Sequence, residues 1–145
     1  MAKVGTRTRE PGQGRTVWVV NQRMTFKVTG EETGGAFALW EDFLDPGEGP
    51  PPHVHANEDE AFYILEGEYT FTVGERALTA TAGSFVLAPK GIPHGLRNTG
   101  DTPGRMLVMV CPAGVERYFF AVGTAGPPTG PPDIERIVAA AGEYG

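Results

Sequence analysis

Glycine and proline interrupt the apolar parts of this chain so regularly that only short elements can form between them. The 145 residues include 21 Gly and 13 Pro. Between these breaks lie eight segments rich in β-branched and aromatic residues, at the spacing expected of a sandwich or barrel. The expected β-strands cover residues 16–20, 24–29, 36–44, 60–67, 69–73, 77–81, 84–88 and 105–110. The chain is therefore predicted to be all-β, with a tight hairpin turn at Gly74 and Glu75.

The hydrophobic period changes after Pro112. Apolar residues recur at i, i+3, i+4 and i+7 in two stretches: Val115, Tyr118, Phe119 and Val122, then Ile134, Ile137, Val138 and Ala141. This spacing predicts two short helices in a C-terminal segment of about 113–142, after a β core of about 16–112. We expect their apolar faces to cover the barrel or a dimer partner; the alternative is that one helix forms a lid over a pocket. A chain of this length suits one core, so residues 1–145 are expected to form a single domain.

The charge and composition of the chain exclude several classes of partner. The formal net charge is −6, which is unlike the basic surface of proteins that neutralise phosphates, so no nucleic acid partner is expected. No stretch approaches the roughly 20 apolar residues of a membrane span, and the N-terminus lacks the apolar segment of a signal peptide. The single Cys111 fits a reducing compartment. We therefore expect a cytoplasmic protein that does not enter membranes.

The most informative polar residues are the histidines. Two of only three, His53 and His55, stand either side of one valine. In a β-strand they would project from the same face roughly 6–7 Å apart, which allows both imidazoles to reach one ion. Glu60 lies at an odd offset from His55, so the intervening residues 56–59 must turn to aim it at the same point. Glu58 and Asp59 compete for this role, but Glu60 leads directly into an apolar strand that can hold it rigidly.

The third histidine, His94, follows a predicted strand and a tight turn containing Pro89 and Gly91. A lone histidine is more often a surface or core residue than a ligand. All three histidines of this chain lie beside predicted turns, and this arrangement favours a metal site. Three imidazoles and one carboxylate suit one divalent transition metal, which can be Fe, Mn, Ni, Co, Cu or Zn.

Ten positions in two runs resemble the two motifs of the cupin superfamily. The first run is Gly47, His53, His55, Glu60 and Gly67, and the second is Gly83, Pro89, Gly91, His94 and Asn98. The 15 residues between the runs are similar to the spacing in compact single-domain cupins. The resemblance implies a double-stranded β-helix barrel, or jelly roll, in which the three histidines and Glu60 bind the metal. The remaining residues of the motifs would be structural, and small cupins are expected to form homodimers.

A narrower likeness is carried by three stretches: "DEAFYILEGEYTFTVGE", "GSFVLAPKGIPHGLRNTGDTPGRMLVM" and "CPAGVERYFFAVG". Together they resemble the quercetinase-like, or flavonol 2,4-dioxygenase-like, branch of the superfamily over about residues 16–140. This likeness implies an enzyme that uses dioxygen on a small aromatic molecule. Enzymes of that branch are often two-domain chains, and in this respect the present sequence departs from the pattern.

The expected ligand set suggests a mechanism. Four protein ligands leave about two open positions on an octahedral ion, and the metal would lower the pKa of a bound hydroxyl. Glu60, if it loosens from the ion, would take the proton as general base. Phe62 and Ile64 share the face of Glu60 by alternation and would line an apolar substrate pocket, with Trp40 as a third candidate; the alternative is that these side chains only fill the core.

Three functions fit these residues. The first is a dioxygenase acting on an aromatic or enolisable small molecule. The second is a non-redox, metal-dependent polyketide cyclase or isomerase. The third is a small-ligand binding cupin without catalysis. Firmly bound Zn would favour the second and a redox-active metal the first, but the sequence does not give the identity of the metal.

Overall fold

The computed structural model describes residues 4–144, and within them the chain forms nine β-strands and three helices. The strands are β1 (Arg15–Val19), β2 (Gln22–Val28), β3 (Ala38–Leu44), β4 (Asp59–Glu66), β5 (Glu68–Val73), β6 (Arg76–Thr81), β7 (Phe85–Ala88), β8 (His94–Asn98) and β9 (Gly104–Cys111). The helices are α1 (Gly30–Thr33), α2 (Val115–Val122) and α3 (Ile134–Tyr144).

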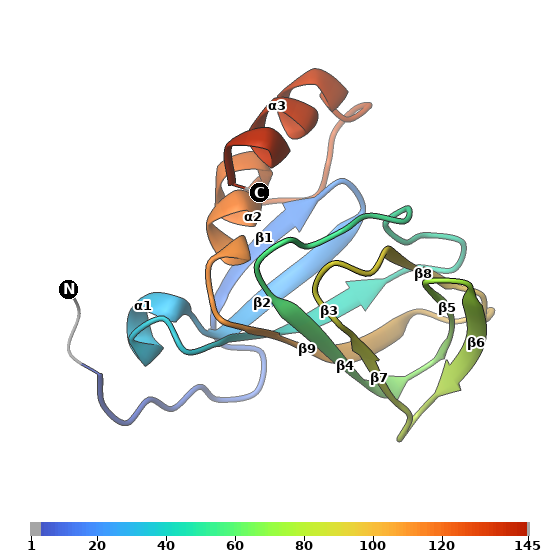
Figure 1. Cartoon of the computed structure of the whole chain (residues 1–145), viewed down its shortest axis with the longest axis horizontal. Helices are drawn as coiled ribbons and strands as arrows, with labels where there is room; N and C mark the ends of the chain where they lie inside the picture. Colours follow the sequence, from blue (N-terminus) through green and yellow to red (C-terminus); the bar gives the residue numbers. More distant parts are fainter. Residues whose placement is uncertain (1–3, 145) are drawn as a thin grey trace.

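The strands form two antiparallel sheets with the core between them. The larger sheet has the order β1-β2-β3-β9-β4-β7, and the smaller one has the order β6-β5-β8 (Figure 1). Side chains alternate between buried and partly exposed along β3 and β9, as expected when one face of a strand packs inward. The largest buried side chains include Trp40, Phe62, Tyr69, Phe71 and Met106. The prediction of an all-β jelly-roll barrel with short C-terminal helices is confirmed.

The eight predicted strands all form, with ends that differ by at most two residues. The hairpin turn at Gly74 and Glu75 is also present, since Val73 pairs with Arg76. The ninth strand, β8, was not among the eight predicted strands. It follows the predicted turn after Pro89 and belongs to the smaller sheet, whereas β7 belongs to the larger one. Helix α1 was not predicted; it is short and begins with a capping box between Thr29 and Glu32.

The two C-terminal helices stack against one end of the larger sheet, above β1 in Figure 1. On α2, the Phe119 ring packs 5.6 Å from the Trp40 ring, and the Phe120 ring packs 4.8 Å from the Phe26 ring. Helix α3 is held against α2 by a hydrogen bond from the Tyr118 hydroxyl to the Ile137 carbonyl. None of the helices in residues 4–144 has the length and apolar character needed to cross a bilayer.

The segment 47–55 runs antiparallel to β8 without forming a regular strand. Backbone hydrogen bonds join Gly47 and Glu48 to Asn98 at one end, and His53 and His94 bond each other in both directions at 2.8 and 2.9 Å. Between these points, residues 50–52 are prolines, which cannot donate to a ladder. His53 and His55 therefore do not lie on a regular strand, and within the described segment only a single bridge forms, at His53.

Close contact between this segment and β8 depends on a small residue. A Cβ atom placed on Gly95 would lie 2.9 Å from the Pro52 backbone nitrogen. Because backbone atoms cannot move aside cheaply, a side chain here would push the segment away from β8. The packing fixes the distance between His94 and the two histidines of the segment.

Candidate metal centre

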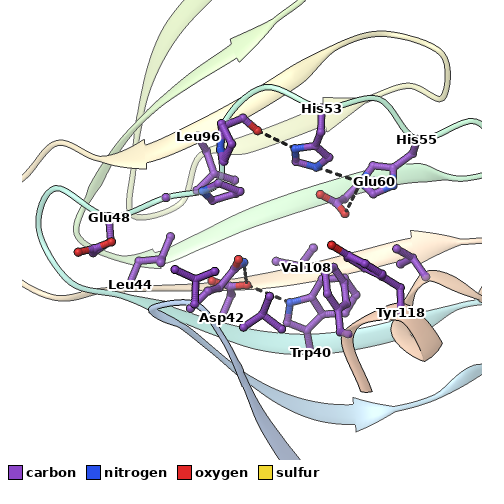
Figure 2. Close-up of a pocket in the computed structure, with 18 of the residues that line it drawn as sticks. Trp40, Asp42, Leu44, Glu48, His53, His55, Glu60, Leu96, Val108 and Tyr118 are labelled. Carbon is purple, nitrogen blue, oxygen red and sulfur yellow. Dashed lines mark hydrogen bonds and ion pairs between the residues drawn. The ribbon is translucent and has the colours of Figure 1, made fainter. Parts of the chain in front are cut away.

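Four side chains that lie far apart in the sequence converge in the structure. One ligand atom from each of His53, His55, Glu60 and His94 lies within 4.8 Å of all the others. The Nε2 atoms of His53 and His55 are 3.1 Å apart. Glu60 places Oε1 3.3 Å from the Nε2 of His94 and Oε2 3.5 Å from the Nε2 of His55. Figure 2 shows His53, His55 and Glu60 pointing toward one another.

Different elements supply the four side chains. His94 begins β8 in the smaller sheet, and Glu60 is the second residue of β4 in the larger sheet. His53 and His55 come from the segment alongside β8. The chain bends at residues 56–57 before β4 begins, as the odd offset of Glu60 required.

Hydrogen bonds on the outer edges of two imidazoles fix their orientation. The Nδ1–H of His53 donates to the Pro51 carbonyl at 2.8 Å, and the Nδ1–H of His55 donates to Glu58 at 2.7 Å. Since both acceptors are oxygens that cannot donate, Nδ1 carries the hydrogen in each ring. In the neutral ring each Nε2 therefore offers a lone pair to the centre of the cluster, which is the tautomer that a metal ligand requires. The Nδ1 of His94 is buried without a partner among the described residues.

The surroundings shift the pKa values of two of these histidines in opposite directions. Burial lowers the pKa of His53, and the nearby His94 and His55 lower it further. Burial also lowers the pKa of His55, but its hydrogen bond to Glu58 and the charges of Glu60 and Glu58 outweigh that effect, so the net shift is upward. The cluster thus combines facing lone pairs with a carboxylate, and this arrangement attracts a cation.

The spacing of the donors fits a single transition metal ion. Metal–ligand bonds of about 2.1 Å place neighbouring donors about 3.0 Å apart in an octahedron and about 3.4 Å apart in a tetrahedron. The separations of 3.1, 3.3 and 3.5 Å between neighbouring donor atoms fall close to this range. Imidazole and carboxylate are also the donor types used for first-row transition metals. The cluster can therefore hold such an ion.

Three of the four cluster residues lie in the wall of a cavity of about 340 Å³. His53, His55 and Glu60 line it together with Trp40 and Phe62, two of the three expected pocket residues. The rest of the wall is mostly apolar, with side chains that include Val19, Leu44, Leu96, Val108, Val115 and Phe119. The volume lies at the lower end of the roughly 300–1,000 Å³ typical of small-molecule sites.

The third expected pocket residue, Ile64, does not face this cavity. It follows Phe62 by two positions on β4 and is 0% exposed, in the core between the sheets. It is absent from the described residues that line the cavity. The alternation rule correctly placed Ile64 on the inner face, but the cavity does not extend that far along the strand.

Several residues of the site were not singled out from the sequence. Helices α2 and α3 contribute Tyr118 and Ile137 to the cavity wall, so the C-terminal segment does more than cover the barrel. Glu58 was weighed as a ligand and rejected, and it instead orients His55. Asp42 lies in the cavity wall on β3, and its alternation with Trp40 in the sequence was a signal that could have found it.

Comparisons with known proteins agree with this geometry. The profile of the cupin domain family matches residues 41–110. Quercetin 2,3-dioxygenase from Aspergillus japonicus is 26% identical over 123 residues, which cover 80% of this chain and 35% of that protein. The tetracenomycin polyketide synthase protein TcmJ from Streptomyces glaucescens is 24% identical over 94 residues, or 63% of each chain.

Among solved structures, a Thermotoga maritima protein described as a predicted oxalate decarboxylase superimposes with a TM-score of 0.59 at 27% identity. The match covers 62% of this chain and 79% of that one. The chain spans between 30% and 35% of the length of the first curated relatives it matches.

Proposed function

This chain belongs to the cupin superfamily, and from that membership we propose that it is a metal-dependent dioxygenase acting on an aromatic or enolisable small molecule. One observation carries the proposal: three imidazoles and a carboxylate are spaced for a single ion, and two of the imidazoles and the carboxylate line a mostly apolar cavity. The similarity to quercetin 2,3-dioxygenase over most of this chain supports the same chemistry.

The metal would be held by His53, His55, Glu60 and His94. When bound, a redox-active ion would lower the pKa of a substrate hydroxyl and assist the reaction of the resulting enolate with dioxygen. Glu60 is proposed to have a second role as general base, receiving the proton at one of its carboxylate oxygens. It is only 5% exposed, so bulk water would not compete for that proton.

The cavity walls would orient the substrate and exclude water. The Trp40 and Phe62 rings line the cavity close to the cluster and offer flat apolar surfaces to an aromatic ligand. Tyr118 and Ile137, from the two C-terminal helices, add to the wall. An anionic intermediate that is shielded from water would persist long enough to meet dioxygen.

The test is oxygen uptake by protein of known metal content. The untagged protein is purified, its metals are measured, and uptake is followed with flavonols and 1,3-dicarbonyl compounds after loading with Fe, Mn, Ni, Co or Cu. We expect uptake with at least one metal, and we expect Glu60→Gln to reduce the turnover rate by at least about a hundredfold. No uptake with any metal and any of these substrates would refute the dioxygenase proposal.

A second function is favoured by a specific similarity. The match to the tetracenomycin polyketide synthase protein covers 63% of this chain and supports a non-redox polyketide cyclase or isomerase. The same four ligands would then hold Zn, and Glu60 would move a proton without any use of dioxygen. Conversion of an aromatic polyketide by the Zn-loaded protein under nitrogen would favour this function over the first. Tight binding without conversion in either assay would indicate a binding protein.

We also propose that the protein is a homodimer in the cytoplasm. Exposed apolar side chains on β4 and β7, namely Tyr63, Phe85 and Leu87, support self-association through the outer face of the larger sheet. The single Cys111 suits a reducing compartment. Light scattering on purified protein measures the mass directly, and a monomer at micromolar concentration would contradict the dimer.

A further inference from the structure

The cavity contains a second buried acid that takes no part in the metal cluster. Asp42 lies on β3, on the same inward face as Trp40 and Leu44, and all three line the cavity. It is 1% exposed. Figure 2 shows Asp42 beside Trp40, on the opposite side of the pocket from His53. The wall around Asp42 is mostly apolar, although Gln22 and Glu48 also line it.

The two oxygens of this carboxyl group differ in their hydrogen bonding. Oδ2 accepts hydrogen bonds from the Trp40 indole N–H at 3.0 Å and from the Gln22 amide at 2.5 Å. Oδ1 is buried and has no partner among the described residues. Since both donors bind Oδ2, any proton on the carboxyl group lies on Oδ1. The group can then either accept or donate a hydrogen bond at that atom.

A second unpartnered group lies in the core. The Tyr69 hydroxyl is also buried without a hydrogen-bond partner among the described residues. Burial raises the pKa of Tyr69, and the charge of Asp42 raises it further, which places the two groups within electrostatic range of each other. Buried polar atoms are almost always hydrogen-bonded in folded proteins. The unpartnered Oδ1 of Asp42, on a residue that lines the cavity, indicates a place where a polar group from outside the chain binds.

A purely structural role does not account for this acid. Asp42 forms no ion pair with the described residues, so no buried cation needs its charge. Its bonds to Trp40 and Gln22 use one oxygen, and an asparagine at this position would make the same contacts. The unused Oδ1 is the feature that distinguishes an acid from an amide here.

We propose that Asp42 is a specificity-determining residue whose Oδ1 forms a hydrogen bond with an oxygen substituent of the substrate, remote from the metal. This rests on the proposed function, in which the other end of the substrate lies at the four-ligand cluster. The substrate class that follows is an apolar ring system with a chelating oxygen pair at one end and a further hydroxyl or carbonyl group at the other.

The test compares matched ligands on wild-type protein and three variants. The protein is loaded with Zn²⁺ and kept under nitrogen, so that binding is measured without turnover. Calorimetry gives Kd for 3-hydroxyflavone, which has the chelating pair alone, and for its 5-, 7- and 4′-monohydroxy derivatives. The variants are Asp42→Asn, Asp42→Leu and the matched control Glu41→Gln, which removes a charge from the outer face of the same strand.

We expect wild-type protein to bind at least one monohydroxy derivative roughly tenfold more tightly than 3-hydroxyflavone itself. Both Asp42 variants should reduce this ratio to less than about threefold, whereas Glu41→Gln should keep it. A wild-type ratio near one for every derivative would overturn the proposal, as would a ratio that survives in both Asp42 variants. Oxygen uptake by the redox-metal form is measured separately. Thus a protein that discriminates the ligands but consumes no oxygen refutes only the dioxygenase function.

Discussion

Replacing Asp42 with asparagine should change how the stability of the protein depends on pH. Burial raises the pKa of Asp42 from 3.8 to about 7, although hydrogen bonds from Gln22 and Trp40 partly oppose the effect. The unfolded chain keeps a pKa of about 3.9. Between these values the folded protein holds a proton that the unfolded chain has already released. The stabilising contribution of this group is therefore complete below about pH 4 and is lost progressively up to about pH 7.

The size of the effect follows from the two pKa values. A difference between 3.8 and about 7, at about 1.4 kcal/mol for each pH unit, gives a penalty of about 4 kcal/mol once both states are ionised. Asparagine does not ionise and can still accept the hydrogen bonds from Trp40 and Gln22. The free energy of unfolding of Asp42→Asn minus that of wild type should therefore increase by about 4 kcal/mol from pH 4 to pH 8.

Urea denaturation of metal-free protein across pH 4–8 measures this difference, because groups unaffected by the substitution cancel between the two proteins. Glu41→Gln is the matched control, and its effect on the free energy of unfolding should depend on pH with the opposite sign. Burial alone would raise the pKa of Glu41, but hydrogen bonds from Arg105 and Lys27 lower it overall, so Glu41 stabilises the fold at high pH and this stabilisation fades as pH falls. If the Asp42→Asn and wild-type curves stay parallel, Asp42 ionises as easily in the folded protein as in the unfolded chain, and the reasoning is refuted.

Three further predictions concern the metal centre and the core. His94→Ala should abolish stoichiometric metal binding while the far-ultraviolet circular dichroism stays that of a β protein; full metal content would show that His94 is not a ligand. Glu58→Gln should weaken metal affinity about 10–100-fold, because Glu58 orients the His55 ring, and competition with a chelating dye measures it; an unchanged Kd would remove that role. Gly104→Ala should lower the melting temperature, since the new Cβ would lie 2.2 Å from the Tyr69 hydroxyl oxygen and 2.6 and 2.8 Å from two of its ring carbons. Tyr69→Leu removes the ring and should therefore cost less stability in the Gly104→Ala protein than in wild type; purely additive effects would mean that the clash lies elsewhere.

The fold was predictable because its signals are local. Apolar and polar residues alternate along each strand, and glycine or proline marks most of the ends. The pairing of the strands followed from the family resemblance and not from the alternation, which gives the inner face of a strand but not its neighbour. Helix α1 was missed because its four residues are too few for a periodic pattern.

The candidate metal centre was predictable for a different reason. The chain has only three histidines, so a site with three histidine ligands could be formed only by His53, His55 and His94. Their backbone conformation was less predictable, since three prolines prevent a regular ladder and His53 and His55 lie on an irregular segment that is hydrogen-bonded to β8.

The extent of the cavity was the hardest feature to foresee. Phe62 and Ile64 have the same pattern in the sequence, yet one lines the cavity and the other fills the core. The difference arises from where α2, α3 and the segment 47–55 lie across the end of the barrel. These are long-range contacts that no local pattern encodes.

The origin of the four candidate ligands has a mechanical consequence. Glu60 belongs to the larger sheet, His94 to the smaller one, and His53 and His55 to a segment that has no regular ladder of its own. A bound ion would therefore cross-link both sheets and the irregular segment at this end of the barrel, so that they unfold as one cooperative unit. Loss of the ion would first loosen residues 47–55 and would leave the opposite end of the barrel closed.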